Sequence, residues 1–305
     1  MKLIAPHIVQ YQGSKRFLAP QILRYVPRLC SRFIEPFAGS AAMTIATALE
    51  NRASSYWIND LNAPLVGLLQ KTVEAPLALL EAYSHIWNDQ FTYRDGHVAH
   101  FYAMRERFNN GEKSPELMLY LLARCVKGSV RYGSNGNFNQ SPDKRRHGTT
   151  PNKLANNLLA VSSLLKNRCS FSAKDYRDVF ASARSGDILY MDPPYQGVSN
   201  KRDNRYFSGV PYAEFVEALY NLNTKGIDYI ISYDGTCGDR GYGEELPKDL
   251  NCRKFLLCAG LSTQSTFLGR REMTYEALYV SKGLCDVAVD AVHFRQNEFP
   301  EAASW

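Results

Sequence analysis

Apolar runs and helical patterns alternate along the first part of the chain. The apolar pair at 33–34 ends in a turn that leads into the good helix formers of 41–49, and the run at 56–58 ends in Asn-Asp before a second helical stretch at 64–71. A strand, a turn and a helix, repeated in this order, are typical of a parallel sheet covered by helices. We therefore predict that the chain begins with an α/β arrangement.

The pattern changes to helices from about residue 75 to residue 165. Phe101, Met104 and Phe108 recur at helical spacing, and the stretches 117–126 and 154–165 are typical of apolar helices. The α/β alternation then resumes, with predicted strands at 187–191, 228–233, 253–258 and 274–280 and a predicted helix at 212–222. We expect the last two strands to form an antiparallel pair at a sheet edge.

The pattern predicts a discontinuous α/β domain with a helical insert. Residues 1–74 and 166–283 would form the α/β domain, and residues 75–165 a helical lobe that interrupts it. The segment 284–305 is a tail to which the pattern assigns no role.

Composition narrows the class of protein without identifying it. The 305 residues are 45% hydrophobic and 22% charged, as in ordinary globular proteins. The sequence contains no run of about 18 apolar residues, the length that a membrane-spanning helix needs. The first residues lack the apolar core of a secretion signal, so we expect a cytoplasmic protein, in a bacterial or phage-infected cell. Seven dispersed cysteines without a C-x-x-C pair indicate reduced thiols and no metal site.

The sharpest chemical feature is the tetrapeptide Asp192, Pro193, Pro194 and Tyr195, which follows the predicted strand at 187–191. Ligands bind at the carboxyl ends of strands in such sheets. Asp192 and the Pro193 carbonyl offer two acceptors for a planar exocyclic amine, the prolines contribute no N–H donors, and Tyr195 can stack on a ring. The alternative is a stiff turn in which Asp192 is only a cap.

Three further segments carry weaker signals. Gly39 lies in a turn of small residues where a ligand could approach the backbone, although G-x-G-x-x-G is absent and a plain β–α turn is the alternative. Asp60 ends the second strand, where a carboxylate can accept ribose hydroxyls or simply cap the next helix. Lys15, in the segment 11–16, places a cation in a flexible turn that could equally be an exposed basic loop.

The loop 124–153 is basic, with seven Lys or Arg residues against one acid and therefore a formal excess of +6. Basic groups can bind phosphates, and amides can read base edges, especially adenine. The alternative is a solvated loop. The DNA-binding candidates here and in the second basic cluster after Tyr195 are Lys127, Arg131, Tyr132, Asn135, Asn137, Phe138, Asn139, Arg145, Arg146, Lys201 and Arg202.

Taken together, these motifs resemble the Dam-like DNA adenine-N6 methyltransferases over residues 10–282. The resemblance rests on the segments 11–16, 35–41, 59–62, 101–109, 128–132, 136–139, 175–176 and 192–195. It departs from the family pattern at Ser14 and Ala41, small residues where the family usually has glycine.

The resemblance implies a Rossmann-like sheet that binds S-adenosylmethionine, with a helical target-recognition insert and with S-adenosylhomocysteine as the product. No metal would be required. The residues that it assigns to the cofactor are Tyr11, Lys15, Glu35, Phe37, Gly39, Asp60, Asp175 and Asp192.

The resemblance also implies the reaction, which is methyl transfer to N6 of an adenine flipped out of duplex DNA. Asp192 and the Pro193 carbonyl would accept the N6 hydrogens, and Tyr195 would stack on the base. A cognate restriction enzyme is a candidate partner.

Four alternatives to adenine-N6 methylation of DNA stay open. Methylation of cytosine N4 more usually has serine at the position of Asp192, and methylation of a protein glutamine favours asparagine there. Methylation of RNA is a third alternative, and the fourth is a non-catalytic DNA-binding module that keeps the fold.

Overall fold

The computed structural model describes residues 5–194, 210–237, 240–242, 245–261 and 273–285. Within these ranges the helices are η1 Lys15–Phe17, α1 Ala19–Ile22, η2 Leu23–Tyr25, α2 Ala42–Leu49, α3 Ala63–Glu74, α4 Pro76–Asp89, α5 Gly96–Asn109, α6 Pro115–Arg124, η3 Val126–Gly128, α7 Pro151–Leu165, α8 Tyr176–Ala181 and α9 Tyr212–Thr224. The strands are β1 Cys30–Glu35, β2 Ala53–Asn59, β3 Cys169–Ser172, β4 Asp187–Met191, β5 Asp228–Cys237, β6 Arg240–Tyr242, β7 Cys252–Leu261 and β8 Met273–Ser281.

All eight strands belong to one sheet, in the order β3-β2-β1-β4-β5-β8-β7, with β6 paired to β5. The first five strands in this order run parallel, whereas β8 pairs antiparallel with both β5 and β7. The order reverses between β1 and β4, which makes this the switch point where ligands of open α/β sheets bind. The predicted antiparallel pair at the edge is confirmed.

Successive side chains of the central strands enter two different apolar layers. Phe33 and Tyr190 pack toward α1, α2 and the helical lobe, whereas Ile34 and Met191 pack toward α8 and α9. A strand buried on both faces is apolar along its whole length. This is why the continuous apolar run at 188–191, which follows Asp187, predicted β4 correctly.

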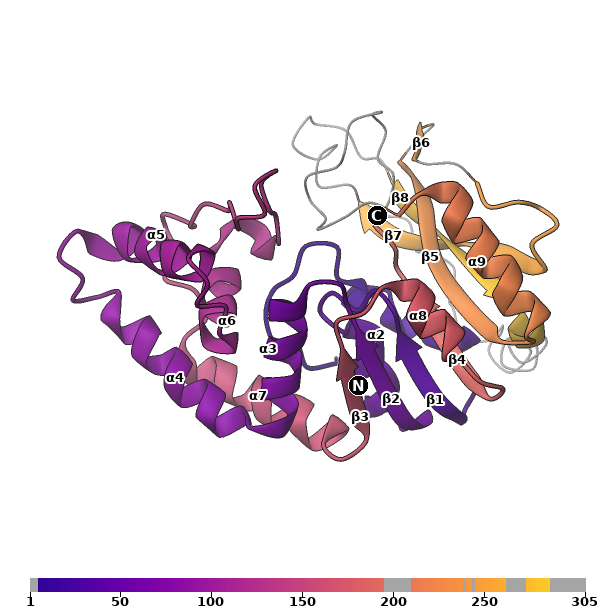
Figure 1. Ribbon diagram of the computed structural model, residues 1–305, viewed down its shortest axis with the longest axis horizontal. Helices are drawn as coiled ribbons and strands as arrows, with labels where there is room; N and C mark the ends of the chain where they lie inside the picture. The colour runs from indigo at the N-terminus through magenta and orange to yellow at the C-terminus, as the bar shows by residue number, and fades with distance from the viewer. Residues whose placement is uncertain (1–4, 195–209, 238–239, 243–244, 262–272, 286–305) are drawn as a thin grey trace, which may run out of the picture.

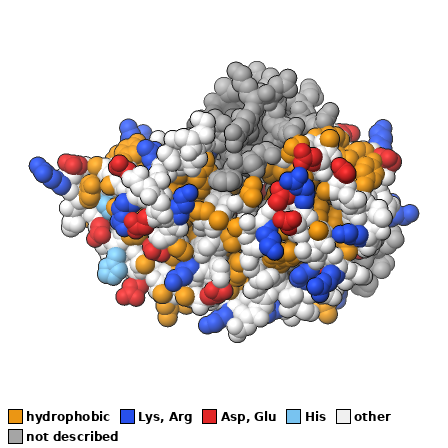
Figure 2. Space-filling view, viewed as in Figure 1, with side chains coloured by type: hydrophobic (Ala, Val, Ile, Leu, Met, Phe, Trp, Pro, Cys, Tyr) orange, Lys and Arg blue, Asp and Glu red, His pale blue; other side chains and the backbone are white. Residues whose placement is uncertain are grey.

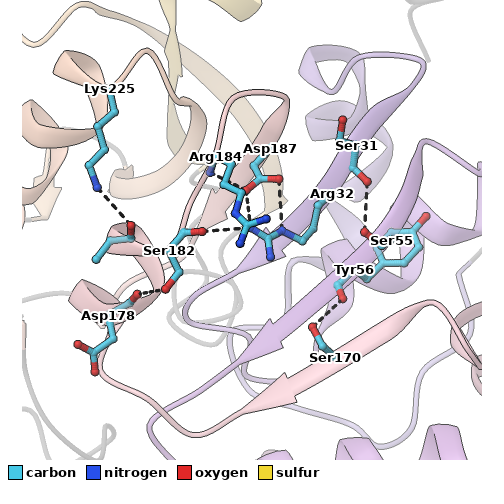
Figure 3. Close-up of polar contacts among 11 residues, drawn as sticks. Ser31, Arg32, Ser55, Tyr56, Ser170, Asp178, Ser182, Arg184, Asp187 and Lys225 are labelled. Carbon is cyan, nitrogen blue, oxygen red and sulfur yellow. Dashed lines mark hydrogen bonds and ion pairs between the residues drawn. The ribbon is translucent and has the colours of Figure 1, made fainter.

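At the amino-terminal edge of the strands, polar contacts tie β1 to β4 (Figure 3). Two guanidinium nitrogens of Arg32 donate to the carboxylate of Asp187, with Nη2 2.6 Å from Oδ2, and the backbone N–H of Arg184 donates to the same oxygen. The start of β4 is therefore fixed relative to β1, and the opposite ends of the two strands stay in register.

The helices α4, α5 and α6 form an arm beside the sheet, and α3 and α7 lie between this arm and the sheet (Figure 1), with α7 in contact with both α2 and α4. The helix predicted at 117–126 ends at Arg124, two residues early. One apolar layer continues from the sheet into the arm, since Phe33, Leu69 and Leu119 belong to the same buried cluster. The boundaries 75 and 165 of a separate lobe stay a prediction.

No helix in the described ranges combines the length and apolar character that crossing a bilayer requires.

Candidate active site

A cavity of about 570 Å³ opens at the carboxyl ends of β1, β2 and β4. Its volume lies within the range of about 300–1,000 Å³ that small-molecule and cofactor sites occupy. The structure brings all eight predicted cofactor residues to its wall: Tyr11, Lys15, Glu35, Phe37, Gly39, Asp60, Asp175 and Asp192.

The turn after β1 is held by the carboxylate of Asp60. The backbone N–H of Gly39 donates to Oδ2 of Asp60 at 2.9 Å, and that of Asn62 donates to Oδ1 at 2.9 Å. Burial raises the pKa of Asp60, partly offset by these N–H donors. Asn62, not Asp60, caps helix α3 by accepting from the N–H of Leu65, so the alternative that Asp60 is merely a cap is wrong.

Gly39 has a positive φ of 49°, which favours glycine. A Cβ at this position would come 3.2 Å from the ring of Tyr11. Ala41, at the position of a usual family glycine, also has a positive φ of 54° and is buried. The alanine therefore carries backbone strain on the order of 1 kcal/mol without blocking the cavity.

Glu35 ends β1 as a buried carboxyl group that accepts the backbone N–H of Thr44 at 2.8 Å. Burial raises its pKa to about 7, and the nearby charge of Asp192 acts in the same direction. The N–H groups of Thr44 and Met43 oppose this rise. Near neutral pH, the protonated and the charged form of Glu35 are therefore both populated.

Lys15 pairs with two carboxylates of the cavity wall. Its ammonium lies 3.2 Å from Oδ1 of Asp192 and 3.1 Å from Oε2 of Glu276, and its side chain is 8% exposed. Beside it, the buried hydroxyls of Tyr190 and Ser232 lie 2.7 Å apart. The pKa of Tyr190 is raised well above its ordinary value by burial and then by Asp192.

Asp175 caps the short helix α8 and is bound by a neighbour. Its Oδ1 accepts the backbone N–H and Nε of Arg177, and its Oδ2 accepts Nη2 at 3.1 Å. These bonds to Arg177 lower the pKa of Asp175. Arg177 also pairs with Glu214 of α9 at 3.0 Å, so an ion-pair chain lies along one rim of the cavity.

The predicted DNA-binding residues of the loop 124–153 divide into two groups. Seven are surface side chains, of which Arg131 is half-buried and the rest are exposed: Lys127, Arg131, Asn135, Asn137, Asn139, Arg145 and Arg146. Tyr132 and Phe138 are buried instead. Tyr132 donates to Oδ1 of Asn62 at 3.1 Å, and the ring of Phe138 packs against Phe108. Because core aromatic rings cannot reach a duplex, we correct these two assignments to supports of the loop.

Arg124 contributes no charge to the loop surface, because it is fully buried at the end of α6. Its guanidinium donates to the backbone carbonyls of Asp143, Arg146 and His97. The loop segment that carries Arg145 and Arg146 is therefore anchored from beneath.

The predicted site residues Tyr195, Lys201 and Arg202 lie outside the described residues. Sequence reasoning missed Asn59 and Glu276. Asn59 is buried at the end of β2, and its amide binds the carbonyls of Pro36 and Lys174. Asn59 lies in the segment 59–62, which carries part of the family resemblance, and could have been predicted from it. Glu276 lies in an ordinary strand pattern that does not indicate a functional residue. In the described ranges no three His, Cys, Asp or Glu side chains gather as a metal site would need.

The five parallel strands, the switch point between β1 and β4, and the antiparallel strand β8 between β5 and β7 form a Rossmann-like methyltransferase fold. The family model of the D12 class N6 adenine-specific DNA methyltransferases matches residues 11–253, and the chain belongs to this family. Its members transfer a methyl group to N6 of adenine in DNA.

Three curated relatives are similar to this chain. The DNA N-6-adenine-methyltransferase of Escherichia phage P1 is 26% identical over 75% of this chain, and the chain spans only 30% of that protein. The Retron Ec67 DNA adenine methylase of Escherichia coli is 26% identical over 75% of this chain and 77% of its own length. The Type II methyltransferase M1.LlaDCHI of Lactococcus lactis subsp. cremoris is 25% identical over 80% of this chain and 85% of its own.

Proposed function

We propose that this protein is a site-specific DNA adenine-N6 methyltransferase that uses S-adenosylmethionine and acts on an adenine flipped out of duplex DNA. The observation that carries the proposal is the position of Asp192. Its carboxylate lies just beyond β4 in the wall of the same cavity as the predicted cofactor residues. Methyl donor and acceptor amine can therefore meet in one enclosed space.

The residues of the cavity fit the proposed cofactor. Gly39 and Tyr11 line the cavity at the turn after β1, where any side chain on residue 39 would meet the ring of Tyr11, and the side chains of Asp60 and Glu35 line the same wall. Phe37 and Tyr176 supply aromatic rings 5.2 Å apart at the cavity wall, which suit the adenine of a nucleoside. When bound, the cofactor supplies a methyl group on a positively charged sulfur, which clustered carboxylates attract.

Asp192 and Pro193 would hold the target base. The N6 amine of adenine is a poor nucleophile because its lone pair is delocalised into the ring. A carboxylate and a carbonyl that accept the two N6 hydrogens draw the nitrogen toward tetrahedral geometry and stabilise the positive charge that develops there. Stacking on Tyr195, by family resemblance, offsets part of the few kcal/mol that flipping costs.

The exposed face of the loop 124–153 is proposed to bind the duplex. Lys127, Arg145 and Arg146 are exposed cations for phosphates, and Arg131 is half-buried beside them. Amide side chains of the same loop would read base edges, and these are the exposed Asn135, Asn137 and Asn139. Lys201 and Arg202 complete the proposed contacts by sequence alone.

The biological setting is proposed from the relatives. One relative is named a Type II methyltransferase, which suggests a cognate restriction enzyme as a partner, and another is from a phage. We place the protein in the cytoplasm of a bacterial or phage-infected cell, where the DNA is.

The proposal is tested by incubating pure protein with labelled S-adenosylmethionine and unmethylated genomic DNA, followed by single-molecule sequencing. We expect N6-methyladenine at one recurring short sequence. Label on cytosine N4, or on RNA alone, would replace the proposed substrate. Absence of both methyl transfer and cofactor binding would favour the non-catalytic DNA-binding module.

The Asp192→Ala variant tests the catalytic assignment. We expect methylation to fall below detection, because the N6 hydrogens lose an acceptor, while the circular dichroism spectrum persists and calorimetry still detects some cofactor binding. Asp192→Asn keeps the shape and removes the charge, and should also lose most activity. Normal turnover in either variant would contradict the role given to Asp192.

A further inference from the structure

Glu276 lines the cavity although it comes from an antiparallel strand outside the parallel part of the sheet. It belongs to β8, and its Oε2 is 3.1 Å from the ammonium of Lys15, which also contacts Asp192. Opposite Glu276, the register of β5 shifts between Tyr233 and Gly235, an irregularity of the kind that a β-bulge produces. Bulges are frequent next to active sites, where they re-aim side chains.

Glu276 supplies a second negative charge beside the ammonium of Lys15. A buried ammonium needs a counterion, and Lys15 is 8% exposed. If Asp192 were its only partner, the pair would be neutral, and Asp192 would have little negative charge left to offer an amine that becomes positive. With Glu276 as a second partner, the three groups together carry a formal charge of −1.

We propose that Glu276 is a positioning residue of the methyl transfer, which holds Lys15 and balances its charge so that Asp192 faces the target amine as an effective anion. This inference rests on the proposed function. Glu276 acts through Lys15 and touches neither the base nor the methyl group. Its contribution belongs to the transition state, where positive charge appears on nitrogen, more than to the binding of DNA.

The first test is Glu276→Gln, which keeps the size of the side chain and removes its charge. We expect kcat to fall at least about tenfold, with the KM for DNA changed less than about threefold. The matched control is Glu245→Gln, which removes a carboxylate from an exposed ion pair with Lys254 on the neighbouring strand β7. The control should keep the wild-type kcat.

The second test is a double-mutant cycle with Lys15→Met, which separates a role through Lys15 from a merely structural one. In the Lys15→Met background at saturating cofactor, Glu276→Gln should change kcat less than about threefold, because no ammonium is left to balance. This comparison also serves if Glu276→Gln alone does not fold. Thermal unfolding of each variant reports the fold.

The outcomes separate the inference from the proposed function. A wild-type kcat in Glu276→Gln, or losses that simply multiply in the double variant, would overturn the role of Glu276 and leave the function standing. Absence of methyl transfer by the wild-type protein to every nucleic acid would overturn the proposed function itself.

Discussion

Glu35 couples the stability of the protein to pH, because it is a carboxyl group buried at the end of β1 with a pKa raised to about 7. Burial disfavours its charged form, so the folded state retains a proton that the unfolded chain has lost. The contribution of Glu35 to stability therefore falls as pH rises from about 4.5 to about 7 and does not change further above that. The shift corresponds to about 3 kcal/mol.

The variant Glu35→Gln should remove this dependence. Between about pH 4 and about pH 8, the free energy of unfolding of the variant should rise relative to wild type by about 3 kcal/mol, measured by urea denaturation. Glu81→Gln, an exposed position on α4, is the control and should run parallel to wild type. Parallel curves for Glu35→Gln as well would refute the raised pKa.

Gly128 joins the basic loop to the cofactor side of the cavity. Its φ is +58°, and a Cβ there would lie 1.9 Å from the backbone oxygen of Gln10, while its own carbonyl accepts the N–H of Gln12. Gly128→Ala should therefore destabilise the fold by about 2–4 kcal/mol in urea denaturation.

The control for this substitution is Gly136→Ala. Gly136 has a φ of +76°, and a Cβ added there would meet no other atom within 4 Å, so only the backbone strain of about 1 kcal/mol should appear. Equal losses in the two variants would show that the contact with Gln10 carries no weight.

At the scale of elements, the sequence predicted those strands that are buried on both faces. The runs at 33–34, 56–58 and 188–191 are apolar throughout, and they lie in β1, β2 and β4 at the centre of the sheet. The strand β3 was missed because it is short and half-buried, with the sequence Cys-Ser-Phe-Ser at the sheet edge. Its alternation of polar and apolar residues covers only four residues, which is the shortest run from which such a pattern predicts a strand.

The residues of the candidate site could be predicted where they directly follow a predicted strand. Asp60 and Asp192 could be predicted because each directly follows a strand of the parallel sheet, and the ends of such strands meet. Glu276 could not be predicted, since its contact with Lys15 joins opposite ends of the chain through an antiparallel strand. Tyr132 and Phe138 were wrongly assigned to DNA because an aromatic residue in a basic loop has the same sequence pattern whether it stacks on bases or fills the core.

The loop segment that presents Asn135, Asn137 and Asn139 is held against α5 by the side chain of Asn109. The amide of Asn109 donates to the carbonyl of Phe138 at 3.0 Å and accepts its N–H at 2.8 Å, while Tyr132 and Phe138 pair as a β-bridge. Asn109→Ala removes both bonds and should lower the protection of 133–138 against hydrogen exchange, with a loss of about 1–3 kcal/mol in local stability.

Asn110→Ala is the control for Asn109→Ala, because Asn110 is an exposed residue at the end of α5. Its exchange pattern should match that of the wild type. Unchanged protection in Asn109→Ala would mean that the loop is held mainly by the buried rings of Tyr132 and Phe138.

At the scale of the whole molecule, the net charge of +6 is modest, and binding to DNA depends on where the charges lie. On the face shown in Figure 2, basic and acidic side chains are mixed rather than gathered in one stripe. The loop 124–153 departs from this mixture, with exposed cations that include Arg145 and an Arg146 side chain that is 80% exposed. We therefore expect this loop, more than the overall charge, to set the salt dependence of binding.

The double variant Arg145→Ala/Arg146→Ala tests this expectation. Each cation that neutralises a phosphate releases counterions and contributes about −0.9 to the slope of log K against log salt concentration, so the slope should become shallower by about 2. Lys166→Ala/Lys225→Ala removes as much charge from exposed positions just beyond α7 and α9. Both control positions lie toward the amino-terminal edge of the strands, opposite the cavity, and this control should keep the wild-type slope. An equal change of slope in the two double variants, measured by fluorescence anisotropy over a salt series, would show that net charge rather than the loop governs binding.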